Sequence, residues 1–145
     1  MTEPPVVRFF TEIAIIDHLA RTTAERVLPK GLSMAGFDVL SHLTYRGPTQ
    51  GPAQIASAMQ VTRGAMTGTL KRLAAGGWVA IAPDPRDARG KTVTLTAAGA
   101  EVRAAALAAL APQFDAVVAE VGEPVLVAVL PLLRRLRAHL DAARD

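Results

Sequence analysis

The hydrophobic pattern of this chain changes its period at the glycine pair Gly76-Gly77. Before the pair, RGAMTGTLKRLAA (63–75) places its apolar side chains at helical spacing. After it, WVAIA (78–82) and TVTLT (92–96) are typical of strands, and DPRDARGK (84–91) supplies a turn in which Gly90 can take a positive φ. The sequence therefore predicts a helix that leads directly into a two-stranded hairpin, with Arg89 and Gly90 at its tip.

Two short helices are expected before this unit. Ser33 can cap the first of them, and Pro52 suits the first turn of the second. Thr62 can then cap the helix that precedes the glycine pair, and Thr96 can cap a long helix after the hairpin. The expected helices cover 6–28, 34–46, 52–60, 63–75 and 97–121, and a last one starts near 123.

This order of elements predicts the fold class. It is mainly α-helical with a small β-hairpin wing, which is the arrangement of a winged helix-turn-helix flanked by helices on both sides. With 145 residues, of which half are apolar, the chain has about the size of one compact domain with a real core.

Composition limits the classes of protein to consider. There is no cysteine, which excludes disulfides, thiolate zinc sites and thiol redox sensing. The N-terminus lacks a basic segment leading into an apolar signal core, and the strongest apolar run, 125–133, is short and broken by Pro131. We therefore expect a soluble, cytoplasmic protein without a membrane partner.

The net charge of +3 is unevenly distributed along the chain. Segment 61–100 carries six basic residues against two acidic ones, whereas the segments on either side are close to neutral. A polyanion is the natural partner of such a segment, and a solvated basic loop is the alternative. The basic residues are Arg63, Lys71, Arg72, Arg86, Arg89 and Lys91.

The helix at 63–75 has two faces. Met66, Leu70 and Leu73 lie together on a helical wheel, and the opposite side is small and basic. In a helix-turn-helix, such a helix lays its polar face into the DNA major groove. The residues expected to contact DNA from this segment are Thr62, Arg63, Gly64, Thr67, Gly68, Lys71 and Arg72.

Their chemistry suits this role. Arg63 can bind a guanine or a phosphate, and Thr67 can reach a base edge or a thymine methyl group. Lys71 and Arg72 suit phosphates, and Thr62 places the helix N-terminus near the DNA backbone. The sequence contains neither a Ser-His-acid set nor a phosphate-binding loop, so we expect no enzymatic activity.

Two glycines within this helix are unexpected, because each costs about 1 kcal/mol relative to alanine. Gly64 and Gly68 can allow the helix backbone to approach the DNA major groove closely. The alternatives are tight packing against the preceding helix or no special role.

The hairpin is expected to reach the neighbouring minor groove, whose negative potential attracts an inserted arginine. Arg89 is the best candidate, with Arg86 and Lys91 as flanking contacts. Asp87 can hydrogen-bond either the Arg89 guanidinium or the turn backbone and so orient it. A merely solvated hairpin is the alternative.

These features together resemble the MarR family of bacterial transcription regulators. The resemblance covers about 33–96 and is carried by VTRGAMTGTLKRLAAGGWV (61–79), by the wing DPRDARGKTVTLT (84–96) and by the AAG that follows. It implies a homodimer formed by the first helix and the last two, a pseudo-palindromic DNA operator, and release by a small molecule. It also places Asp87 and Arg89 on the family's Asp-x-Arg pair in the wing.

The resemblance divides the chain into an N-terminal dimerisation helix (1–32), a winged helix-turn-helix (33–96) and C-terminal dimerisation helices (97–145). The expected function is a dimeric DNA-binding transcriptional regulator, a repressor released by an aromatic or phenolic effector. Larger polar side chains are usual in the family at Gly64, Ala65 and Gly68, and basic ones at Ile81 and Ala82, so we expect fewer base-specific contacts here. A winged-helix protein adaptor with little specific DNA affinity is therefore the alternative.

The effector is expected between the helices at 6–28, 34–46 and 97–121. Arg8, His42, Tyr45 and Arg46 can supply polar contacts there for an anionic aromatic ligand in an otherwise apolar crevice. No metal site or cofactor is expected, because His18, His42 and His139 are too far apart in sequence for a local metal motif.

Overall fold

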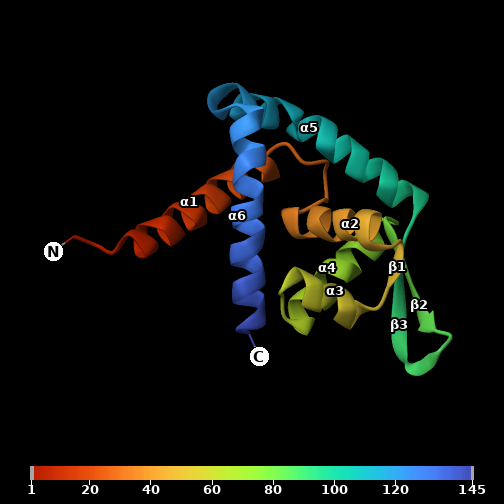
Figure 1. The fold of residues 1–145 in the computed structure, drawn as a ribbon. Helices are drawn as coiled ribbons and strands as arrows, with labels where there is room; N and C mark the ends of the chain where they lie inside the picture. The colour runs from red at the N-terminus through yellow and green to blue at the C-terminus, as the bar shows by residue number, and fades with distance from the viewer. Residues whose placement is uncertain (1, 145) are drawn as a thin grey trace. The chain divides into compact units, whose positions relative to one another are not determined.

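The computed structural model describes residues 2–144 and confirms the mainly helical winged fold (Figure 1). The helices are α1 (Pro5–Glu25), α2 (Met34–Arg46), α3 (Pro52–Met59), α4 (Arg63–Ala75), α5 (Ala97–Val121) and α6 (Glu123–Ala142). The strands are β1 (Thr49–Gln50), β2 (Val79–Asp84) and β3 (Asp87–Leu95). The chain divides into two compact units, residues 1–110 and 111–145.

Local capping explains where the inner helices begin. The side chain of Ser33 accepts a hydrogen bond from the Gly36 amide at 3.0 Å, and Thr62 accepts one from the Ala65 amide at 3.1 Å. Each hydroxyl thereby satisfies one of the amides that a helix start leaves without a partner. Thr96 caps α5 in the same way, through the Gly99 amide at 3.0 Å.

The core of the first unit lies between α2, α3, α4 and the sheet. Its apolar side chains are Leu32, Val39, Leu40, Leu43, Ile55, Ala56, Met66, Leu70, Leu73, Val79, Val93 and Ala106, all buried. Trp78 packs against this core partly buried. The burial of Met66, Leu70 and Leu73 confirms the two-faced character predicted for α4.

The sheet has three antiparallel strands in the order β1-β3-β2. Strand β1 pairs Thr49 with Thr94 and Gln50 with Val93, in the short segment between the helices expected at 34–46 and 52–60. Its two residues are too few to show an alternating pattern. β1 fixes the base of the hairpin to the turn that follows α2.

The tip of the hairpin lies elsewhere than predicted. Strand β2 continues to Asp84 and β3 already starts at Asp87, so Pro85 and Arg86 form the turn. Gly90 lies within β3 and is not among the residues with positive φ. The register slips between Pro83, which faces Lys91, and Asp84, which faces Asp87. Residues 88–90 of β3, which the sequence had suggested for the turn, lie within this irregular part of the ladder.

The outer helices bury few side chains within the single chain. In α1 only Ala24 is buried, and in α6 no residue is. Of the helices described, α5 is the one that is long and apolar enough to cross a membrane by length and composition. Its buried residues, Gly99, Ala106 and Leu110, all fall within the first unit.

Candidate nucleic-acid interface

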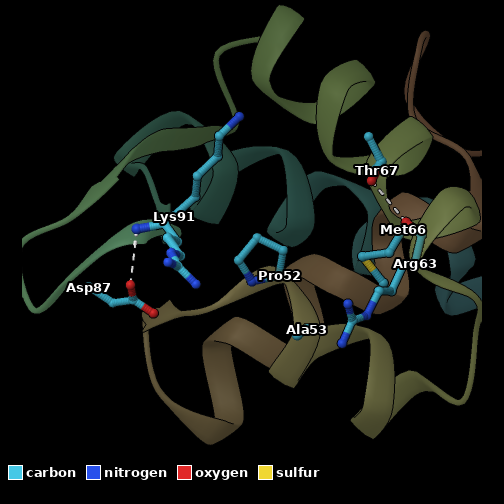
Figure 2. A pocket seen from close by; sticks show the side chains of 9 residues that line it. Pro52, Ala53, Arg63, Met66, Thr67, Asp87 and Lys91 are labelled. Carbon is cyan, nitrogen blue, oxygen red and sulfur yellow. Dashed lines mark hydrogen bonds between the residues drawn. The ribbon is translucent and has the colours of Figure 1, made fainter.

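A groove of about 530 Å³ lies between helix α4 and the β2–β3 hairpin. In Figure 2, Arg63 and Thr67 lie on one side of this groove and Asp87 and Lys91 on the other. The fold thus brings five of the residues predicted from sequence to one place. The lining consists of Pro52, Ala53, Arg63, Met66, Thr67, Asp87, Arg89, Gly90 and Lys91.

The other predicted residues of α4 lie outside the lining of this groove. Lys71 and Arg72 are exposed further along the helix, and Arg86 is exposed at the hairpin tip. Thr62 is exposed and uses its side chain as the helix cap. Lys71, Arg72 and Arg86 thus add exposed cations on α4 and at the hairpin tip, outside the residues that line the groove.

The hydroxyl group of Thr67 is already engaged. Its Oγ1 donates a hydrogen bond to the carbonyl oxygen of Arg63 at 2.8 Å. This leaves the Thr67 methyl group and the remaining lone pair of its oxygen for a ligand. A contact to a thymine methyl group fits this geometry better than donation to a base.

The two glycines of α4 are not required by packing inside the protein. A Cβ atom added to Gly64 would meet nothing within 4 Å. One added to Gly68 would come near only the Arg72 guanidinium of the same helix, at 3.7 Å. The interpretation that these glycines allow tight packing against α3 is therefore wrong, because no α3 atom lies close enough.

The two acidic residues of the hairpin shape its backbone. Asp84 Oδ1 accepts a hydrogen bond from the Arg86 amide at 2.9 Å, and Asp87 Oδ1 accepts one from the Arg89 amide at 2.9 Å. Both are turns in which an aspartate binds the backbone two residues later. Of the two roles left open for Asp87, the structure shows the bond to the turn backbone.

The basic side chains of this surface therefore keep their charge unpaired. Within residues 2–144, ion pairs join Arg21 to Asp17, Arg21 to Asp38 and Arg144 to Asp141, and none involves a residue from 61–100. A cluster of exposed cations without acidic partners raises the local positive potential. This charge distribution favours an anionic partner.

The residues predicted to bind an effector lie apart from this groove. His42 is half-buried, and its Nε2 lies 2.7 Å from Oε1 of the buried Gln50 in β1. Tyr45 is 74% exposed, and Arg8 and Arg46 are exposed on α1 and at the end of α2. No group of three or more His, Cys, Asp or Glu residues that could hold a metal ion occurs within the described part of the chain.

Sequence reasoning missed Arg103, which joins α5 to α2. Its Nε donates to Ser41 Oγ at 3.0 Å and its Nη2 donates to the Tyr45 hydroxyl at 3.1 Å. The guanidinium also lies 4.8 Å from the centroid of the Tyr45 ring and 5.9 Å from that of Phe37. As the only basic residue of 97–121, Arg103 could have been noticed from the sequence.

Comparison with known proteins shows which family this chain is similar to. Residues 30–90 match a model described as MarR family. The chain is 32% identical over 90 residues to the multiple antibiotic resistance protein MarR of Escherichia coli strain K12, covering 59% of this chain and 62% of that protein. A MarR family transcriptional regulator from Streptomyces coelicolor superposes with a TM-score of 0.81 at 26% identity, over 99% of both chains. The chain is therefore similar to MarR family regulators, and the match to the family model covers residues 30–90.

Two further comparisons give proteins that are similar to this chain. It is 31% identical over 96 residues to the transcriptional activatory protein BadR of Rhodopseudomonas palustris, which covers 65% of this chain and 55% of BadR. The aligned segments thus span less than two thirds of both curated relatives. A cysteine-to-serine variant of Escherichia coli MarR, solved in complex with operator DNA, shares the fold with a TM-score of 0.78 at 22% identity, over 90% of this chain and 94% of that one.

A third solved structure shares the fold of this chain. It is the organohalide-sensing regulator RdhR in its 2,4-dichlorophenol-bound form. The TM-score is 0.84 at 17% identity, and the alignment covers 99% of this chain and 85% of RdhR.

Proposed function

We propose that this protein is a MarR-type regulator: a dimeric, sequence-specific DNA-binding transcriptional regulator of the cytoplasm, with no catalytic role. The groove between α4 and the hairpin, with its unpaired cations, carries the proposal. In this arrangement α4 enters the major groove and the β2–β3 wing reaches the adjacent minor groove. Arg63 and Thr67 then face base edges, while Lys71 and Arg72 bind phosphates.

Dimerisation follows from the apolar side chains that a single chain leaves exposed. On α1 these include Val6, Phe9, Phe10, Ile15, Ile16 and Leu19, and on α6 they include Val125, Val127, Val129, Leu130, Leu132, Leu133 and Leu140. Exposed apolar surface of this extent marks an interaction site. We assign 1–32 and 97–145 to dimerisation and 33–96 to DNA binding.

The dimer should be stable, with well over about 2,000 Å² buried in total, as in obligate pairs. Sedimentation velocity at micromolar concentration should give the mass of two chains. A monomer with full helical content by circular dichroism would contradict the assignment of the outer helices.

A symmetric dimer should bind a symmetric site, because its two recognition helices enter successive major grooves about one helical turn apart. Selection of bound duplexes from a randomised pool should therefore return an approximate palindrome. If the selected pool keeps no shared sequence, the protein adaptor remains as the function. The small face around Gly64 and Gly68 is the observation that favours the adaptor, because it offers few side chains for reading bases.

The glycines of α4 allow a test that separates stability from binding. Gly64→Ala should raise the stability of the fold by up to about 1 kcal/mol, because alanine favours a helix and meets no neighbour. The same change should weaken operator binding if the α4 backbone approaches the DNA closely. Thermal unfolding and operator titration measure the two effects, and Ala105→Gly on the exposed side of α5 is the matched control. Unchanged affinity would show that Gly64 has no special role in binding.

We propose repression as the mode of regulation, with release by an aromatic effector that contacts Arg8, His42, Tyr45 and Arg46. A dimer seated across a promoter blocks transcription by occupancy alone. The Arg103 guanidinium beside the exposed Tyr45 ring adds a cation that has no acidic partner within residues 2–144. Such a pair suits the carboxylate or phenolate of a one-ring compound.

The effector proposal predicts release of DNA by small aromatic compounds. Benzoate and 2,4-dichlorophenol should be titrated into the complex with operator DNA, and at least one should lower its affinity. Tyr45→Ala should abolish this effect while leaving operator binding without the compound unchanged, because Tyr45 lies outside the α4 groove. Release that persists in this variant would exclude the assigned site.

A further inference from the structure

A second cavity of about 290 Å³ lies among residues of α1, α2, α3 and α4. Its apolar walls include Val39, Met59, Val61 and Met66, and its polar groups include Arg21 and Asp38. Met66 is the one residue that it shares with the lining of the α4 groove. The cavity is therefore distinct from the surface assigned to DNA and from the residues assigned to the effector.

The charged groups at and beside this cavity do not balance. Asp17 does not line the cavity, but Arg21 Nε donates to Asp17 Oδ1 at 3.1 Å, and Arg21 Nη1 donates to Asp38 Oδ2 at 3.2 Å. One guanidinium thus serves two carboxylates, which leaves a local excess of one negative charge. Asp38 Oδ1 has no hydrogen-bond partner within the described residues.

The environment of Asp38 is partly desolvated, and its side chain is 25% exposed. Burial raises the pKa of Asp38 above its ordinary value, although the nearby Arg21 acts in the opposite direction. The single ion pair with Arg21 therefore does not fully offset the cost of burying the charged Asp38 carboxylate. A second cation at the free Oδ1 would complete the compensation.

We propose that this cavity binds a small apolar ligand that carries one positive charge. The ammonium group of the ligand binds Asp38 Oδ1, and its apolar body packs against Val39, Met59 and Met66. The volume of about 290 Å³ lies just below the usual range for small-molecule sites, about 300 to 1,000 Å³, which limits the ligand to about one ring. This site goes beyond the proposed regulatory function and does not depend on DNA binding.

An anionic ligand does not fit the same groups. It would have to approach a guanidinium already engaged by Asp17 and Asp38, and both carboxylates would repel it. The preference for a positively charged ligand is therefore the property that best distinguishes this site.

The test uses three probes of similar shape and different charge. Calorimetric titration of the full chain at neutral pH should show binding of 2-phenylethylammonium, weaker binding of neutral 2-phenylethanol, and none of 3-phenylpropanoate. Equal or tighter binding of 3-phenylpropanoate, or no binding of the ammonium probe, would overturn the proposal.

Three variants locate the site. Asp38→Asn should weaken 2-phenylethylammonium binding about tenfold, because a close ion pair is lost while the shape is kept. Arg21→Gln should strengthen it several-fold, because a like charge is removed and both carboxylates remain. Ala35→Leu should fill the cavity and abolish binding of the ammonium and neutral probes alike.

Circular dichroism and thermal unfolding confirm that each variant is folded. The Arg21 side chain is 46% exposed, so we expect Arg21→Gln to fold. This variant still tests the proposal if Asp38→Asn lowers stability. Weaker ammonium binding by Arg21→Gln, or unchanged binding by a folded Asp38→Asn, would contradict the assignment of charge.

Discussion

Arg89→Ala should weaken operator binding by about 1 to 3 kcal/mol and reduce the salt dependence of the affinity, because one positive contact to DNA is lost. Arg89 lies in β3 against the α4 groove, and no acidic residue pairs with it within residues 2–144. Titration of one labelled operator duplex at several salt concentrations measures both effects. Lys30→Ala, which removes an exposed cation outside the groove, is the matched control.

Asp87→Ala should weaken operator binding as well, although it removes a negative charge. Asp87 Oδ1 holds the Arg89 amide at 2.9 Å, so its loss frees the backbone that positions the Arg89 side chain. If the hairpin were a nonspecific basic loop, removal of an acid would tighten binding to a polyanion. Tighter binding by Asp87→Ala would therefore refute the positioning role.

Gly99→Ala should produce the largest loss of stability among the glycine variants. Gly99 is buried at the start of α5, and a Cβ there would overlap the backbone carbonyl of Trp78 and lie 2.8 Å from Leu95 Cδ1. A backbone carbonyl cannot rotate away as a side chain can, so α5 has to move from the start of β2. We expect destabilisation of about 1 to 3 kcal/mol or more, as for overpacked cores.

The sign makes this result diagnostic, because alanine normally stabilises a helix relative to glycine. Urea unfolding of Gly99→Ala, compared with Gly64→Ala, measures the difference between a glycine that packing requires and one that it does not. Equal or higher stability of Gly99→Ala would contradict the close packing of α5 on Trp78.

Much of the fold follows from local signals in the sequence. The starts of α2, α4 and α5 were predicted because Ser33, Thr62 and Thr96 bind amides only three residues away. The hairpin tip was predicted wrongly, because glycine was given more weight than the two aspartates. In the structure, the carboxylates of Asp84 and Asp87 organise the turn region, and Gly90 needs no positive φ.

The candidate site was predicted only in part, because some of its properties depend on contacts between residues far apart in the sequence. The excess of basic residues in 61–100 is a property of sequence, whereas their lack of ion-pair partners depends on which distant acids the fold brings near. Arg103 illustrates the same limit: its hydrogen bonds to Ser41 and Tyr45 span 62 and 58 positions along the chain. The cavity beside Asp38 likewise depends on residues from four helices.

Binding to DNA from the region upstream of its own gene tests the central claim most directly. The wild-type protein should be titrated, at one fixed salt concentration, with this duplex and with a shuffled duplex of the same composition. A sequence-specific regulator should prefer its own DNA by about 10³-fold or more. Equal affinity for the two duplexes would contradict the assignment of the α4 groove and the wing to operator recognition.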